Sequence, residues 1–104
     1  MKSIIEGLNK AFNNKIRVGI MAVLVVNEWV DFNTLKDLLQ VSDGNLASHL
    51  TALEKESYIQ YKKEFIGKKP RTSYKATDDG KKAFNNHLNA LENLLNNNNI
   101  DLNS

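Results

Sequence analysis

The fold is decided by residues 42–57, which read SDGNLASHLTALEKES. Leu46, Leu50 and Leu53 recur at helical spacing and form one narrow apolar stripe. Ser42 precedes the stripe as an N-cap, and Asp43 follows in the first turn, where a negative charge favours a helix. The stretch therefore predicts an amphipathic helix over residues 43–57 whose opposite face is open to a partner.

A second short helix is predicted immediately before it. Asn33 is a candidate N-cap, and the apolar positions that follow are Leu35, Leu38 and Leu39. Residues 40–42 are then a tight connection. Two short helices joined by three residues are typical of a helix-turn-helix.

After Ser57 the apolar period changes from helical to alternating. Ile59, Tyr61 and Phe65 share one face of a predicted strand, and residues 72–77 are predicted as the return strand. The Gly and Pro of residues 67–71 indicate a loop between them. This pattern predicts a β-hairpin, or wing, with a five-residue cationic tip.

The flanks complete the predicted architecture. We expect a helix over residues 4–12, a core helix over 15–27, one or two strand residues within 28–32, and a last helix that begins after Thr77. The fold class is α+β, mostly α: a winged helix-turn-helix with a two- or three-stranded wing and N- and C-terminal dimerisation helices. The domain spans residues 1–96, and the asparagine-rich residues 97–104 are predicted to be a flexible tail.

The charge is unevenly distributed. The chain of 104 residues has a net charge of +2, whereas residues 61–75 contain six basic residues and one acidic residue. A basic segment on an otherwise acidic body favours local contact with a polyanion. The alternative is a solvated hairpin whose lysines keep a sheet edge soluble.

Composition also excludes several classes of protein. Without cysteine there is no disulfide scaffold, no thiolate metal site and no cysteine nucleophile, and two histidines offer little for a metal. The chain shows no glycine-rich phosphate loop and no converging carboxylates, so we expect no enzyme and no cofactor. The longest apolar run is half of what a bilayer requires, and the first residues do not resemble a signal peptide, which favours a cytoplasmic protein with no membrane partner.

The open face of the helix over residues 43–57 fits a nucleic-acid groove. An α-helix enters the major groove of DNA, where Asn45 can pair with an adenine edge and small polar side chains allow close approach. The wing over residues 66–72 would lie on the backbone or in a minor groove. The alternative is that these polar residues are merely solvated, with Asn45 capping its own helix and His49 packing beside the leucines. The candidate DNA-binding residues are Ser42, Asp43, Asn45, Ser48, His49, Thr51, Lys55, Lys68, Lys69 and Arg71.

Four segments together resemble ArsR/MarR-like winged-helix transcriptional regulators: DGNLASHL (residues 43–50), LEKESYI (53–59), FIGKKPRTSYKATDDG (65–80) and IRVGIM (16–21). The resemblance covers residues 8–95. It implies a homodimer that binds double-stranded DNA through the second helix of the helix-turn-helix, with residues 43, 45, 48 and 49 at the DNA. Metal-sensing members use Cys or His/acid clusters, which this sequence lacks, and no residue identifies a small-molecule effector.

An apolar seam predicts how two copies would pair. Phe84, Leu88, Leu91 and Leu95 repeat at four-three-four spacing along the last helix. With the first helix they give the candidate dimerisation residues Ile4, Ile5, Leu8, Phe12, Phe84, Leu88, Leu91 and Leu95. The alternative is that the two helices pack on each other within one monomer.

Two other functions remain open at this point. Winged helices also serve as protein–protein adaptors without DNA binding, and some bind RNA. Steep salt dependence of duplex binding would distinguish a DNA-binding protein from an adaptor.

Overall fold

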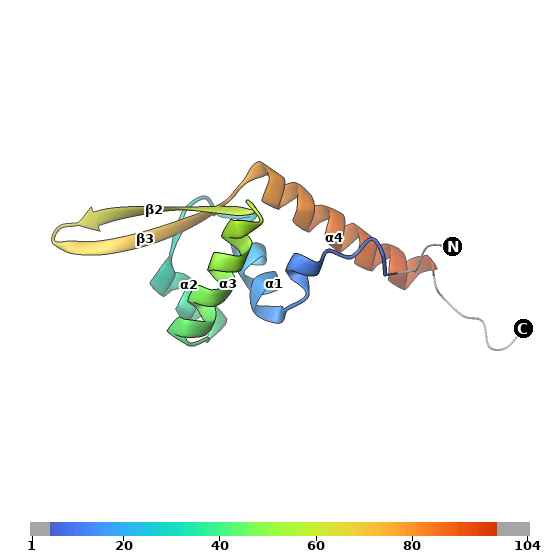
Figure 1. Cartoon of the computed structure of the whole chain (residues 1–104), viewed down its shortest axis with the longest axis horizontal. Helices are drawn as coiled ribbons and strands as arrows, with labels where there is room; N and C mark the ends of the chain where they lie inside the picture. Colours follow the sequence, from blue (N-terminus) through green and yellow to red (C-terminus); the bar gives the residue numbers. More distant parts are fainter. Residues whose placement is uncertain (1–4, 98–104) are drawn as a thin grey trace, which may run out of the picture.

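The computed structural model describes residues 5–97, and its fold is the predicted winged helix. The β2–β3 hairpin projects from one end of the domain and α4 from the other, with the remaining helices between them (Figure 1). In chain order the elements are a 3-10 turn (Lys10–Phe12), α1 (Lys15–Leu24), β1 (Val30–Asp31), α2 (Phe32–Leu39), α3 (Asp43–Lys55), β2 (Ile59–Ile66), β3 (Lys69–Ala76) and α4 (Asp78–Asn97).

The helix-turn-helix is formed by α2 and α3. Gln40 adopts a left-handed conformation after α2, and the Ser42 side chain caps α3 by accepting the Asn45 N–H at 3.2 Å. The cap expected at Asn33 is wrong, because α2 begins at Phe32 and its N-cap is Asp31, two residues earlier, whose side chain accepts the Thr34 N–H. The predicted end of α3 at Ser57 is also too late.

The end of α3 is a Schellman motif. Ser57 has a φ of 64°, its N–H donates to the Glu54 carbonyl, and the Tyr58 N–H donates to the Leu53 carbonyl. This conformation stops the helix at Lys55 and turns the chain directly into β2.

The sheet has the strand order β1-β3-β2 and is antiparallel throughout. The wing tip is shorter than predicted, because Ile66 pairs with Lys69 and leaves only residues 67–68 as the loop. Gly67 supplies the positive φ (66°) of this two-residue turn. Pro70 is accommodated within β3 because β1 pairs only with Ser73 and Tyr74, so Pro70 needs no N–H for a ladder on that edge.

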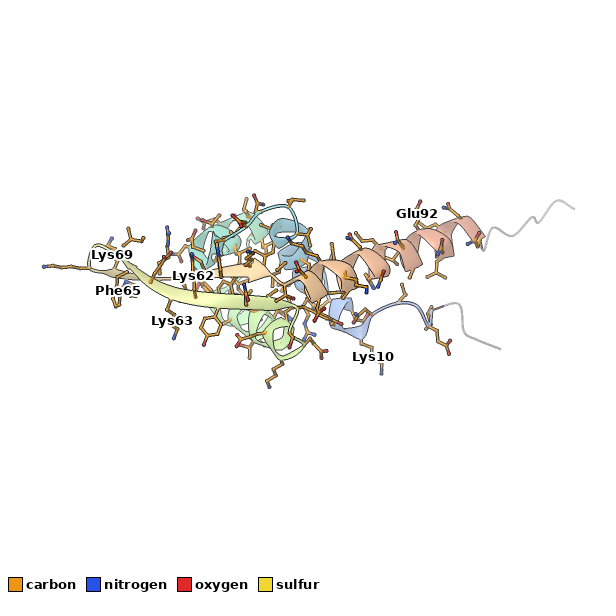
Figure 2. The ribbon with its side chains drawn as sticks, turned by 90° about the horizontal axis from the view of Figure 1, so that it is seen from above. Lys10, Lys62, Lys63, Phe65, Lys69 and Glu92 are labelled. Carbon is orange, nitrogen blue, oxygen red and sulfur yellow. The ribbon has the colours of Figure 1, made fainter. Side chains whose placement is uncertain are left out.

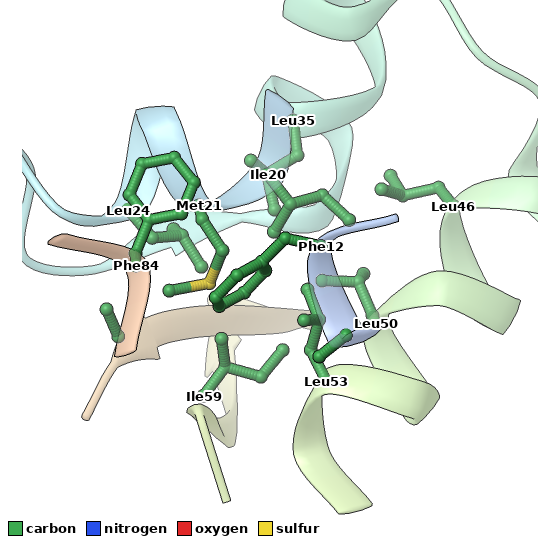
Figure 3. Packing of buried hydrophobic residues seen from close by; sticks show 12 residues of the cluster. Phe12, Ile20, Met21, Leu24, Leu35, Leu46, Leu50, Leu53, Ile59 and Phe84 are labelled. Atoms are coloured by element: carbon green, nitrogen blue, oxygen red, sulfur yellow. The ribbon is translucent and has the colours of Figure 1, made fainter. Parts of the chain in front are cut away.

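The core is assembled from one apolar face of every helix. Figure 3 shows Phe12 between the side chains of α1 and the leucines of α3. The apolar pattern of α2 included Leu38, but its side chain is exposed and is not part of the core. The largest fully buried side chains are Ile20, Met21, Leu24, Leu35, Leu46, Leu50 and Leu53.

The helix expected over residues 4–12 does not form; Ile4 lies outside the described residues, residues 5–8 are turns and a bend, and Asn9 is extended before the 3-10 turn. Asn9 is the reason. Its extended backbone donates its N–H to His87 Nδ1 at 3.0 Å, and its side chain caps the 3-10 turn by accepting the Ala11 N–H. A continuous helix would have used that N–H for an intrahelical bond.

The last helix, α4, begins as predicted after Thr77, whose hydroxyl accepts the Gly80 N–H at 2.9 Å. Its C-terminal half extends beyond the body of the domain (Figure 1). Asn97 ends the helix, and the rest of the predicted tail lies outside the described residues.

Candidate nucleic-acid interface

The outer face of α3 is exposed along its whole length. Leu46, Leu50 and Leu53 are buried beneath it, which fixes the rotation of the helix and turns the polar residues outward. The side chains of this face are small or polar, so the backbone of α3 is accessible to a partner. The exposed residues are Asp43, Gly44, Asn45, Ala47, Ser48, Thr51 and Lys55.

The first turn of α3 carries an ion pair. The Lys36 Nζ lies 2.8 Å from an Asp43 carboxylate oxygen, and this hydrogen bond and charge raise the pKa of Lys36 above 10.5. Asp43 is among the candidate DNA-binding residues, and its negative charge would otherwise repel a phosphate. Lys36 offsets that charge at the surface.

An arginine from α1 contacts the middle of α3. Arg17 Nε donates to His49 Nδ1 at 3.0 Å, so Nε2 is the His49 nitrogen that carries a proton in this arrangement. Arg17 also lines a shallow hollow with Ser48, Thr51 and Lys55. Arg17 could not be identified from the sequence, because only the packing of α1 against α3 brings it to His49.

The register of the hairpin separates its side chains onto two faces. Ile59 and Ala76 form a buried pair on the face that covers α3, and alternation places Lys63 and Phe65 on the same face. Lys62 lies on the opposite side of the hairpin from Lys63 (Figure 2). Lys63 was not among the candidate site residues, although the alternation from Ile59 would have indicated its face.

The cations of the wing are not equivalent. Arg71 lies on the face away from α3 and pairs with Glu64 at 3.1 Å, so its charge is partly neutralised. On that same face Lys62 and Lys75 lie over the Trp29 ring, with their Nζ atoms 4.4 and 5.8 Å from its centroid. The basic segment is therefore two surfaces instead of one strip.

The tip carries the remaining positive charge of the wing. Lys68 is in the turn and Lys69 begins β3, and both are exposed. Nearer the body, burial raises the pKa of Tyr74 above its ordinary value, and the Glu54 charge adds to this effect. Contact of Lys68, Lys69 and Arg71 with DNA stays a prediction. Lys68 lies in the turn between the two faces, whereas Lys69 lies on the same face as Arg71.

The candidate dimerisation residues divide into two groups. Phe12 and Phe84 are each 3% exposed and pack edge to face at 5.3 Å, so they belong to the core of the monomer and not to a dimer surface. Leu88, Leu91 and Leu95 are 42%, 39% and 81% exposed along α4. On the N-terminal segment, Ile5 is exposed and Leu8 is half-buried.

Within residues 5–97 no three His, Asp or Glu side chains lie close enough together to share a metal ion. His87, one of the two histidines, is buried at the junction of α4 with the N-terminal segment, where Asn9 also donates to the Tyr58 hydroxyl at 3.0 Å. None of the helices in the described part of the chain has the length and apolar character needed to cross a membrane.

Comparison with known families identifies the domain. Residues 16–95 match the family described as the winged helix DNA-binding domain. An uncharacterized protein of Methanocaldococcus jannaschii is 40% identical over 79 residues, which cover 76% of this chain and 86% of that protein.

Three solved structures illustrate the likeness in fold. A transcriptional regulator homologue from Pyrococcus horikoshii superposes with a TM-score of 0.81 and 27% identity, covering 93% of this chain and 94% of that one. The likeness to PadR of Bacillus subtilis, solved with operator DNA, concerns the fold alone (TM-score 0.65, 17% identity, 72% and 48% covered). The same holds for MepR of S. aureus, solved with DNA (TM-score 0.68, 14% identity, 81% and 68% covered).

Proposed function

Because the chain belongs to the winged helix DNA-binding domain family, we propose that it is a transcriptional regulator that binds a specific double-stranded DNA sequence as a homodimer. In this proposal α3 enters the major groove and the wing follows the backbone into the adjacent minor groove. No cofactor is required for binding. We place it in the cytoplasm, as the sequence predicts.

The observation that carries the proposal is the exposed outer face of α3. Gly44, Ala47 and Ser48 leave the helix backbone accessible, so the helix can approach base edges closely. Asn45 lies in the first turn of α3, where recognition helices contact bases, and its amide can donate to and accept from one adenine. We assign it the main base-reading role.

Cations on both sides of α3 support the proposal. Arg17 and Lys55 border the hollow over the middle of the helix, and Lys63 lies on the wing face that continues from α3. Lys68, in the turn between the two strands, extends this charge to the tip. Side chains of this kind hold phosphates on either side of an inserted helix and release counterions when they bind.

Pairing of two copies supplies the affinity that one short site lacks. A single α3 spans only a few base pairs, and dimers of helix-turn-helix proteins read two half-sites about 34–36 Å apart. The exposed leucines of α4, Leu88, Leu91 and Leu95, are the surface that we assign to this dimer. Phe12 and Phe84 are buried in the core of each monomer and are not part of this surface.

The experiment is selection of bound duplexes from a random library, followed by binding measurements over a range of salt concentrations. We expect a selected site with dyad symmetry and affinity that falls steeply with salt. Asn45→Ala will relax preference at one base position and weaken the selected site by about 1–3 kcal/mol. Replacing Lys63 and Lys68 with alanine will weaken binding to all sequences and flatten the salt slope by about 0.9 for each phosphate that the protein no longer neutralises.

A matched control uses the opposite face of the wing. Replacing Lys62 and Lys75 with alanine also removes cations from the hairpin, but these side chains lie over Trp29 and face away from α3. We expect the salt slope of this variant to stay close to that of the parent. Equal losses in both variants would contradict the assigned wing face, and absence of salt-dependent duplex binding in the parent would favour the adaptor function. Preference for an RNA duplex of the same sequence would favour the RNA-binding alternative.

A further inference from the structure

We propose that the wing tip is an apolar wedge, formed by Phe65 with Pro70 opposite it, that enters the minor groove of bound DNA and unstacks one base step. This inference rests on the proposed function and adds a second mode of recognition to it. Its starting observation is that Phe65 is 73% exposed at the far end of a charged hairpin. A hairpin that only needed to stay soluble would gain nothing from an aromatic ring in water.

The register of the hairpin fixes the face on which Phe65 lies. Phe65 pairs with Pro70, and alternation places both on the face of Ile59 and Ala76, which covers α3. Figure 2 labels both Phe65 and Lys69 near the tip of the hairpin. The ring is therefore carried on the DNA-facing side of the wing, whereas Ile66 pairs with Lys69 on the other side.

The reach of the hairpin fits the spacing of the grooves. Ile59 is anchored in the core and Phe65 is six residues further along β2, which at about 3.3 Å per residue places the ring about 20 Å from the anchor. The centres of adjacent major and minor grooves are separated by about half a helical turn, about 17 Å along the axis. With α3 in the major groove, Phe65 is at the distance of the next minor groove.

The charges around Phe65 complement that groove. Lys63 precedes it on the same face, and Lys68 follows in the turn. The minor groove is strongly negative, and Phe and Pro are among the side chains that proteins insert between base steps there. The two lysines would bind DNA phosphates on both sides of the groove, while the Phe65 ring takes the place of one base–base stacking contact.

The opposite side of the tip provides the comparison. Ile66 is also exposed, at 54%, but its neighbours on that face are the Glu64–Arg71 ion pair and Lys69. This face is turned away from α3, so with α3 in the major groove Ile66 does not point into the groove that Phe65 reaches. The same tip thus offers one apolar side chain suited to the groove and one that is not, which makes Ile66 the matched control for Phe65.

The test uses the full chain and a defined probe. The probe is an alternating A–T duplex of about three helical turns with 2-aminopurine at a central TA step, because such steps unstack easily. Binding is followed by anisotropy of an end label, and unstacking by the 2-aminopurine fluorescence, which rises when the base leaves the stack. The variants are Phe65→Ala, Phe65→Leu and Ile66→Ala, all at exposed positions, with folding checked by circular dichroism.

We expect the parent to raise 2-aminopurine fluorescence several-fold at saturation and to bend an end-labelled duplex by an angle within about 20–90° in energy-transfer measurements. Phe65→Ala will bind the duplex within about tenfold of the parent, because the lost stacking of the ring on a base is offset by the base step that no longer has to be unstacked. The 2-aminopurine fluorescence with this variant will stay at the level of the free duplex. Phe65→Leu will restore part of the signal, and Ile66→Ala will match the parent.

The outcomes separate this inference from the proposed function. If the parent binds but the fluorescence does not rise, or if Phe65→Ala preserves the rise, the wedge is wrong and DNA binding stands. If the parent gives no anisotropy change at low salt, both are wrong. If Phe65→Ala abolishes self-association in sedimentation experiments, the ring belongs to a protein interface, and the wedge is overturned.

Discussion

Gly80, the third residue of α4, lies where the wing returns to the body of the domain. Its N–H donates to the Thr77 hydroxyl, and the Thr77 N–H donates to the Tyr58 carbonyl at 3.0 Å. A Cβ at Gly80 would overlap that same carbonyl. The start of β2 and the start of α4 are thus held together by backbone contacts that leave no room for a side chain.

Gly80→Ala therefore tests whether close packing outweighs helix propensity. Alanine favours a helix over glycine by about 1 kcal/mol, but the overlap with the Tyr58 carbonyl requires a backbone shift. We expect a net destabilisation of about 1–3 kcal/mol in denaturant unfolding.

Gly44→Ala is the control for this prediction. A Cβ at Gly44, in the first turn of α3, meets nothing within 4 Å among the described residues. At this position only the helix propensity of alanine changes the stability, so the free energy of unfolding will rise by up to about 1 kcal/mol. Equal effects at the two glycines would contradict the role of close packing at Gly80.

At the scale of single residues, local chemistry is what the sequence predicts well. Ser42 and Thr77 could be identified as caps because a cap depends on backbone groups a few residues away. The Arg17–His49 hydrogen bond joins residues 32 positions apart on two helices, and no local pattern indicates it. Contacts of this kind need the packed structure.

The junction of β1 and α2 depends on one carboxylate. Asp31 ends β1 and caps α2: its side chain accepts the Thr34 hydroxyl at 2.6 Å and the Thr34 N–H at 3.3 Å. The hydroxyl hydrogen bond is the main reason that the pKa of Asp31 lies below its ordinary value of 3.8. Because the pKa is lowered on folding, the charged carboxylate stabilises the fold above that ordinary value, and this contribution is lost as the pH falls through the lowered pKa.

Asp31→Ala is expected to lower the free energy of unfolding by about 1 kcal/mol at neutral pH, through loss of the cap. The difference from the parent will shrink in denaturant unfolding as the pH is lowered through the folded-state pKa of Asp31, below 3.8. Asp31→Asn keeps a capping oxygen without a titrating charge, so its stability will change less over this range. A difference between parent and Asp31→Ala that is constant with pH would contradict the role of the charged cap.

At the scale of elements, periodicity predicts the long segments and misses the short ones. The leucines of α3 and the alternation of β2 are local repeats, and both elements are found. The N-terminal helix is wrong because Asn9 gives its N–H to His87, far along the chain. The tip is shorter than predicted because Pro70, expected in the loop, belongs to β3, where its edge is not paired with β1. The Gly and Pro of residues 67–71 do not by themselves reveal this position.

At the scale of the whole molecule, the surfaces assigned to DNA and to a second copy are separate. The wing and the exposed leucines of α4 lie toward opposite ends of the domain, with α3 between them (Figure 1). Burial of Phe12 and Phe84 shows why the sequence alone could not distinguish core from dimer surface, since one seam of α4 serves the core at its start and is exposed further along. Leu95, the most exposed of these leucines, is the clearest sign of an unsatisfied apolar face.

The proposed dimer is tested by changing that face and no other part of the domain. Because Leu91 and Leu95 are exposed, replacing both with glutamate will leave the monomer fold intact in circular dichroism while placing charge in the dimer interface. We expect sedimentation experiments to find a dimer for the parent and a monomer for this variant, with affinity for a site of dyad symmetry reduced by about 10²–10⁴ through loss of simultaneous binding. Replacing the exposed Asn89 and Asn93 with glutamate adds the same charges one turn apart on another face of α4 and will preserve the dimer. A parent that is monomeric at micromolar concentration, or a leucine variant that stays dimeric, would show that two copies do not pair through this face.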